Sequence, residues 1–322
     1  MIQMPVKEMT PLLIEPPADS LQHILPYYHM AASARCRPLC RRHNLFYLVD
    51  DPMQGTSMVL RVSGLRRKEE ELAAEALWMC EIRRDTHLMV PRPFQTDAGT
   101  FATALSHPLL PRGYYCMAFS YLRGTSPEVK PDDYPVLFRR LGELAAQLHQ
   151  NSILWSCANR LPRSTIDCDV INESLFEGLD DADLFLRVLI IVRERLIRFG
   201  RTPDRFGLIH ADLRPENLLV DKDNTSLLDF DDCGYGWFLY DCAASVSGME
   251  TNPLRSYLIQ AWLEGYRNYR KISREEANEL PTFLMLNRLL RLDSKLRTGS
   301  LSEEFLRDTA ALAVQYVCAH TR

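Results

Sequence analysis

The sequence predicts an α+β fold in two parts: a small N-terminal antiparallel β-sheet lobe with one key helix, and a larger α-helical C-terminal lobe. Segments rich in β-branched and aromatic residues lie before residue 122, whereas most segments with helical periodicity lie beyond it. The composition changes at residues 122–127, which read LRGTSP. We therefore expect residues 1–122 to form the first lobe and residues 123–322 the second.

A hairpin is expected near the start of the first lobe. Residues 45–49 and 57–62 have strand composition and are joined by the turn-forming segment 50–56. Side chains alternate between the two faces of a strand, so Arg61 shares its face with Val59.

Residues 69–84 read as the helix of this lobe, because three glutamates begin the segment and two arginines end it. Glu75 lies three residues after Leu72 and four before Met79, so it projects from the apolar face that packs inward. A carboxylate in that position requires a cationic partner, and Arg61 is the candidate. The alternative is that Glu75 and Arg61 are both surface residues.

The sheet is expected to continue with a hairpin around residues 97–99 and a strand over residues 114–121. That last strand leads out of the sheet toward the helical region, where a hinge would present backbone groups to an adenine edge. Ser120, Tyr121 and Leu122 are therefore candidate nucleotide-binding residues. A plain strand and linker is the alternative.

The second lobe is expected to be mainly helical. Its predicted helices are 134–150, 182–199, 254–270, 275–297 and 303–318. Residues 206–209 form a short apolar run, and residues 218–220 and 227–230 flank a turn at 221–224. This pattern predicts a hairpin inside the helical lobe.

The motif that carries chemistry spans this hairpin. Residues 210–217 read HADLRPEN, and LDFDD follows at residues 228–232. Phosphoryl transfer requires an acceptor for the proton of the nucleophile and ligands for magnesium on the triphosphate. Asp212 is the candidate base, and Asn217 and Asp229 are the candidate metal ligands. An isolated H-x-D is weak evidence, but the whole loop followed at hairpin distance by D-F seldom arises by chance.

Two further polar residues near this motif have structural interpretations. His210 is expected to hold the loop by hydrogen bonds, because Asp212 already fills the role of base. Asp241 is expected to cap or anchor the helix that follows.

Composition excludes several classes of protein. Lys and Arg total 38 against 42 for Asp and Glu, so no general nucleic-acid or membrane-surface binder is indicated. The nine cysteines contain no C-x-x-C pair, which favours reduced thiols in a cytoplasmic protein over a zinc site. There is no basic start followed by an apolar core, and no apolar run of about 18 residues. Neither secretion nor a membrane span is expected.

Several segments together resemble the aminoglycoside phosphotransferase and choline kinase-like superfamily of small-molecule kinases. They are LGELAAQLH at 141–149, LIHADLRPENLLV at 208–220, LLDFDDCGYGWFLYDCA at 227–243, VLRV at 59–62 and the helix with Glu75. The resemblance covers roughly residues 40–270. It implies a bilobal protein-kinase-like fold that uses ATP with Mg²⁺ and transfers phosphate to a hydroxyl of a small metabolite or antibiotic.

The resemblance also implies site residues. Asp212 would be the base, Asn217 and Asp229 would bind magnesium, and Arg61 with Glu75 would serve the nucleotide phosphates, with Arg in place of the usual Lys. Arg214 occupies the loop position of the protein-kinase lysine and is the second candidate catalytic residue, in contact with the transferred phosphate.

One segment departs from the family pattern. Residues 34–44, ARCRPLCRRHN, lie where the family has its nucleotide-covering loop but contain no glycine. A solvated basic turn is the favoured interpretation. The alternative is that the arginines replace the glycines by charge, and the candidates are Arg35, Arg37, Arg41 and Arg42.

The acceptor is expected to be small. Only eleven residues separate Asp229 from Asp241 and no A-P-E follows, so there is no long activation segment on which a peptide could rest. Residues 167–183 contain seven acidic residues and no Lys or Arg, in the insert that shapes the acceptor side of this family. With Asp231 and Asp232 nearby, an amine-bearing alcohol is the hypothesis, and a solvated acidic surface is the alternative.

Two other functions fit the same motifs. A serine/threonine protein kinase of the same fold is one, and a non-catalytic pseudokinase is the other, suggested by the missing glycines. The motifs leave open the acceptor, the choice between ATP and GTP, and the oligomeric state.

Overall fold

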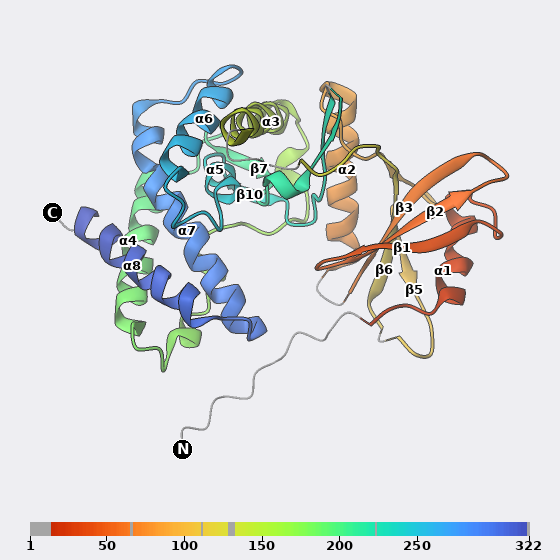
Figure 1. Ribbon diagram of the computed structural model, residues 1–322, viewed down its shortest axis with the longest axis horizontal. Coiled ribbons are helices and arrows are strands. Elements are labelled where there is room, and N and C mark those ends of the chain that lie inside the picture. Colours follow the sequence, from red (N-terminus) through yellow and green to blue (C-terminus); the bar gives the residue numbers. More distant parts are fainter. Residues whose placement is uncertain (1–13, 65–66, 111, 128–132, 223, 321–322) are drawn as a thin grey trace.

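The computed structural model describes residues 14–64, 67–110, 112–127, 133–222 and 224–320. Figure 1 shows a sheet-based lobe on one side and a helical lobe on the other, with helix α2 (Glu69–Asp85) between them. The α+β architecture predicted from the sequence is confirmed. Within the described residues, no helix has the length and apolar character needed to cross a membrane.

The first lobe is an antiparallel sheet in the order β1, β2, β3, β6, β4, with β5 also paired to β6. The elements are α1 (Ala18–Ile24), β1 (Arg35–Arg41), β2 (Leu45–Asp51), β3 (Thr56–Ser63), β4 (Pro93–Phe94), β5 (Ala102–Leu105) and β6 (Tyr114–Ser120). Met58, Leu60 and Val62 of β3 are buried in the core of this lobe. Arg61 therefore lies on the other face of the central strand, as predicted.

The hairpin expected around residues 97–99 is not formed. A turn is present, since the Thr96 N–H donates to the Thr100 carbonyl at 2.7 Å. However, β4 and β5 both pair with β6 and not with each other. The two segments lie one after the other along the same edge of β6, so the turn signal was correct and the strand partner was wrong.

The basic segment is a strand and not the solvated turn that was favoured. Residues Arg35–Arg41 form β1 at the edge of the sheet and pair with β2, with a register shift between Pro38 and Cys40. Charged side chains and a proline are typical of an edge strand, because one side of its backbone needs no partner. The turn proper begins at Arg42, whose N–H donates to the Asn44 carbonyl at 2.9 Å.

Helix α2 belongs to the first lobe and packs against the second. Trp78 on α2 donates its indole N–H to Asn151 of α3 (Tyr134–Leu154) at 3.1 Å. The same indole packs edge-on against Phe230, with ring centroids 5.6 Å apart. Because Phe230 follows Asp229, this contact fixes the position of α2 relative to the candidate metal ligand.

All five predicted helices of the second lobe are present, with bounds shifted by a few residues. The helices of this lobe are α3, α4 (Ala182–Phe199), α5 (Tyr240–Ser245), α6 (Arg255–Arg267), α7 (Arg274–Thr298) and α8 (Glu303–His320). A Cβ atom added to Gly142 of α3 would overlap the Trp262 carbonyl, and one on Gly265 of α6 would overlap the Arg139 carbonyl. The two glycines thus allow the α3 and α6 backbones to pack in direct contact.

Short strands carry the motif residues. β7 (Phe206–Ile209) pairs with β10 (Gly234–Trp237), and β8 (Leu218–Asp221) pairs with β9 (Asn224–Leu227). The predicted hairpin is present, but its second strand begins at Asn224 instead of residue 227, because Asp221 pairs with Asn224 across a tight turn. Residue 223 of that turn lies outside the described residues. Asp229 consequently follows the strand instead of ending it.

Candidate active site

The loop of residues 210–217 is anchored by a buried carboxylate. Asp241 accepts hydrogen bonds from the backbone N–H groups of His210 at 3.1 Å and Ala211 at 2.7 Å. Its Oδ2 also lies 2.9 Å from Nε2 of His149 on α3. Asp241 was expected to cap or anchor a helix; it is structural, but it anchors the motif loop.

His210 holds the loop together, as expected. The Asp212 N–H donates to its Nδ1 at 3.3 Å, so Nε2 carries the proton and donates to the Leu228 carbonyl at 3.0 Å. The ring is fully buried. These contacts join the loop to the segment that carries Asp229 and leave Asp212 as the candidate base.

Two residues of the site have a left-handed backbone. Ala211 has φ of 67° and Asp229 has φ of 62°, a region that costs a non-glycine residue about 1 kcal/mol or more. Asp241 holds Ala211 in this conformation through its N–H. The strain at Ala211 is therefore balanced by a buried hydrogen bond.

Three of the predicted residues meet at Asp212. Its Oδ2 accepts hydrogen bonds from Asn217 Nδ2 at 2.8 Å and from Arg214 Nη2 at 3.0 Å. Arg214 Nε lies 2.6 Å from Oδ1. The Asp212 side chain is 23% exposed, so it can be reached from the solvent side of the loop.

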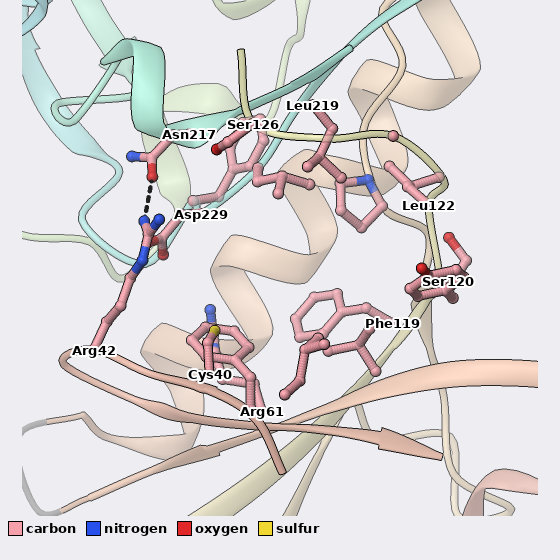
Figure 2. A pocket seen from close by; sticks show the side chains of 18 of the residues that line it. Cys40, Arg42, Arg61, Phe119, Ser120, Leu122, Ser126, Asn217, Leu219 and Asp229 are labelled. Carbon is pink, nitrogen blue, oxygen red and sulfur yellow. Dashed lines mark hydrogen bonds and ion pairs between the residues drawn. The ribbon is translucent and has the colours of Figure 1, made fainter. Parts of the chain in front are cut away.

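Asn217 and Asp229 face a common position. Nη1 of Arg42 lies 2.9 Å from Asn217 Oδ1 and 3.9 Å from Asp229 Oδ2 (Figure 2). The guanidinium nitrogen of Arg42 thus lies close to both Asn217 Oδ1 and Asp229 Oδ2, at a position where two oxygen atoms favour a positive charge. Oxygen ligands of this kind suit Mg²⁺ or Ca²⁺, so the residues present fit a divalent metal ion.

The expected ion pair between β3 and α2 is formed. Arg61 Nη1 and Nη2 donate to Glu75 Oε1 and Oε2, both at 2.7 Å, and both side chains are at most 3% exposed. Burial alone would lower the pKa of Arg61, but the carboxylates of Glu75 and Asp231 outweigh it and raise that pKa above its usual value. Arg61 is therefore a permanent, fixed cation in the cleft wall.

The acidic segment after β9 contains carboxylates in different electrostatic states. Burial raises the pKa of Asp229, and Arg61 only partly opposes this. Burial also acts on Asp231, but the cations of Arg61 and Arg67 lower its pKa overall. Asp231 thus remains charged beside Arg67, whose Nε lies 3.3 Å from its Oδ1.

Arg163 is an organising residue that sequence reasoning missed. It donates to the carbonyls of Cys233 at 2.6 Å, Asp231 at 2.5 Å and Glu71 at 3.1 Å. The side chain is buried and joins the acidic segment to α2. A single arginine in a loop gives no pattern that could have identified it.

A cleft of about 580 Å³ lies between the lobes. Its lining includes Cys40, Arg42, Arg61, Phe119, Ser120, Tyr121, Leu122, Asn217, Leu219 and Asp229, most of which Figure 2 shows around one space. The Ser120 N–H already donates to the Arg92 carbonyl at 2.8 Å. In the part of the chain that the structure describes, the Leu122 amide makes no hydrogen bond, so it remains available to a ligand.

The acidic insert is partly neutralised. Asp167 lies 2.6 Å from Arg201, and Glu173 and Asp169 lie 3.1 Å and 3.9 Å from Arg193 of α4. None of the described insert residues lines the cleft between the lobes. The insert is therefore less negative than its sequence alone indicated.

Comparisons with known proteins agree with this geometry. The model of the phosphotransferase enzyme family (APH) matches residues 40–272. The structure of a microcompartment-associated aminopropanol kinase has a TM-score of 0.79 and 28% identity, covering 95% of this chain and 97% of that one. A structure of amicoumacin kinase in complex with AMP-PNP, Ca²⁺ and Ami has a TM-score of 0.75 and 21% identity, covering 92% and 91%. The predicted protein-kinase-like fold is confirmed.

A sequence match covers a smaller part of the chain. Amicoumacin kinase of Bacillus subtilis (strain 168) is 34% identical over 113 residues. That alignment spans 34% of this chain and 34% of the relative, so it covers about a third of each protein.

Proposed function

Because the chain belongs to the phosphotransferase enzyme family, we propose that it moves the γ-phosphate of ATP to a hydroxyl of a small amine-bearing alcohol. One observation carries the proposal: Asp212, Asn217 and Asp229 are gathered beside a cleft whose wall contains a buried Arg61–Glu75 pair. That arrangement matches the parts that phosphoryl transfer requires.

Each residue has a proposed task. Asp212 accepts the proton of the acceptor hydroxyl while that oxygen forms a bond to the γ-phosphorus and the bond to the bridging oxygen of ADP breaks. Arg214, held against Asp212, stabilises charge on the transferred phosphate. Magnesium held by Asn217 and Asp229 would neutralise phosphate charge.

The nucleotide would lie in the cleft between residues 1–122, as the nucleotide-binding lobe, and residues 123–322, as the catalytic and acceptor-binding lobe. Arg61, oriented by Glu75, would contact its phosphates, as in kinases with a lysine in this position. Ser120, Tyr121 and Leu122 line the opposite end of the cleft and would face the adenine. The Leu122 amide, which none of the described residues occupies, supports this orientation.

An amine on the acceptor is supported by two features. The aminopropanol kinase to which the chain is similar is named for an amino alcohol, and the match spans nearly the whole of both chains. In addition, Asp232 is 56% exposed near the motif loop and can contribute negative charge despite its ion pair with Arg67.

The two other functions are less well supported. The named relatives act on small molecules and give no support to the protein-kinase alternative. The pseudokinase alternative rested on the missing glycines. Against it, Asp212, Asn217 and Asp229 are all present: Asn217 contacts Asp212 directly, and Arg42 lies near both Asn217 and Asp229.

The test compares matched alcohols in the presence of ATP and magnesium. Each amino alcohol is assayed beside the same alcohol without its amine, together with aminoglycosides, sugars and amino acids, and ADP release is measured. Phosphorylation of amino alcohols alone is the expected result. Phosphorylation of neutral or acidic alcohols with no turnover of amino alcohols would contradict the proposed acceptor class.

A further inference from the structure

The first lobe lacks the glycine-rich segment whose backbone usually contacts nucleotide phosphates. No glycine occurs between residues 34 and 51, so neither β1, β2 nor the turn between them contains a residue without a side chain. A side chain keeps the backbone amide of its residue away from a phosphate, whereas glycine has no side chain and lets the amide approach closely. If this lobe binds the terminal phosphate, a side chain has to replace the amide contacts.

Arg42, at the β1–β2 turn, is in the right place to do so. Its guanidinium crosses the cleft, donates to Asn217 Oδ1 at 2.9 Å and to the Glu216 carbonyl at 3.3 Å, and lies 3.9 Å from Asp229 Oδ2 (Figure 2). It is therefore in contact with both candidate metal ligands at once, although it belongs to the other lobe.

The turn that carries Arg42 is fixed on the second lobe. Asn44, which closes the turn, is 6% exposed, and its Nδ2 donates to Asp231 Oδ2 at 3.2 Å. Asp231 is in turn paired with Arg67. The position of Arg42 over the cleft thus follows from a buried contact and not only from a flexible side chain.

The other arginines of the segment have different surroundings. Arg37 is 62% exposed and pairs with Asp50, and Arg41 lies 3.8 Å from Glu15. Among the arginines at positions 35 to 42, only Arg42 lines the cleft in the part of the chain that the structure describes.

We propose that Arg42 is a phosphate-binding residue that takes the place of the glycine-rich loop. Without nucleotide, its guanidinium occupies the position between Asn217 and Asp229. A divalent ion bound by those oxygens at about 2.1 Å leaves no room for it, and the terminal phosphate is then the nearest anion to which Arg42 can turn. A planar guanidinium donates two parallel hydrogen bonds to a phosphate, whereas lysine provides a point charge. The inference rests on the proposed nucleotide-dependent function.

The experiment is isothermal titration of the full chain with Mg²⁺ and either AMP-PNP or ADP. Arg42→Ala and Arg42→Lys are compared with wild type, and Arg37→Ala, on the strand that leads into this turn, is the matched control. A charge-assisted contact of about 1.5–3 kcal/mol corresponds to a loss of roughly tenfold or more in AMP-PNP affinity for Arg42→Ala. ADP affinity, which involves no terminal γ-phosphate, and both affinities of Arg37→Ala should remain within about twofold of wild type, below the tenfold step of 1.4 kcal/mol.

The outcomes separate this inference from the proposed function. Equal or tighter AMP-PNP binding by Arg42→Ala, with wild type binding normally, would show that Arg42 only obstructs the metal position, and would overturn the inference alone. Absence of nucleotide binding by wild type would overturn both. An intermediate loss for Arg42→Lys supports the inference, because lysine keeps the charge but not the paired donors. Since Arg42 is 45% exposed, neither variant is expected to impair folding, and thermal unfolding checks this.

Discussion

The buried pair of Arg61 and Glu75 gives the sharpest prediction. The change Glu75→Gln removes the charge that neutralises Arg61 while keeping the size of the side chain. Arg61 is 2% exposed, and its next carboxylate, Asp231, lies 4.0 Å from Nη1. Breaking a buried ion pair by removing one partner costs about 3–5 kcal/mol. Because Asp231 compensates in part, we expect a loss near the lower end, about 3 kcal/mol of unfolding free energy.

The assay is urea unfolding of the nucleotide-free protein, followed by tryptophan fluorescence. The matched control is Glu81→Gln on the same helix, whose partner Arg84 is mostly exposed to solvent. Glu81 is itself buried, but Arg84 is hydrated in either variant, so the control is expected to change the unfolding free energy by less than about 1 kcal/mol.

A double variant separates stability from function. Replacing both residues, with Arg61→Met and Glu75→Leu, leaves no unpaired charge and should recover most of the stability lost in Glu75→Gln. Nucleotide binding by the double variant should nevertheless be weaker than that of wild type, because it lacks the cation of Arg61 in the cleft wall. A Glu75→Gln loss below about 1 kcal/mol, the range of surface pairs, would show that Glu75 does not neutralise a buried Arg61. So would a double variant as unstable as the sum of its single changes.

The remaining predictions use other parts of the site and fold. Asp212→Asn should lower kcat by about 10²- to 10⁴-fold with nucleotide affinity preserved, measured by steady-state kinetics and titration; unchanged kcat would exclude Asp212 as the base. Asp229→Ala should weaken nucleotide binding in the presence of magnesium more than in its absence, and equal affinities would remove its assignment as a metal ligand. Gly265→Ala should destabilise the protein by about 1–3 kcal/mol in urea unfolding, since its Cβ meets the Arg139 carbonyl; an unchanged midpoint would contradict the close helix packing. Burial lowers the pKa of His149 in the folded protein. As the pH falls below about 6.5, the imidazole is therefore protonated in the unfolded chain before it is protonated in the folded one, and the free energy of unfolding decreases. The stability difference between wild type and His149→Gln should therefore shrink between pH 7.5 and pH 5.5, and a constant difference would exclude this contribution.

The sequence predicted features that depend on nearby residues. The helices follow from periodicity over a few turns, and the burial of Glu75 followed from the spacing of its apolar neighbours on α2. The contact of Asp212 with Asn217 also lies within one short loop. Such features are encoded locally, so one sequence is enough to find them.

Features that depend on distant partners were missed or assigned wrongly. The strand character of β1 depends on pairing with β2, and β4 and β5 both found their partner in β6. Arg42 contacts Asn217 across 175 positions of the chain. Local propensity contains no information on such contacts, because tertiary packing alone brings these residues together.

The proposed function assigns to Asp212, Asn217 and Asp229 the transfer of phosphate from ATP to an alcohol. Phosphorus NMR of the protein with ATP, magnesium and aminopropanol tests it directly, because it distinguishes a phosphate ester from free phosphate and from a phosphoramidate. We expect an ester signal that grows with ADP and is absent with Asp212→Asn. Ester formation at an undiminished rate in Asp212→Asn would exclude this assignment, as would the absence of an ester with any small alcohol when wild type binds ATP and magnesium.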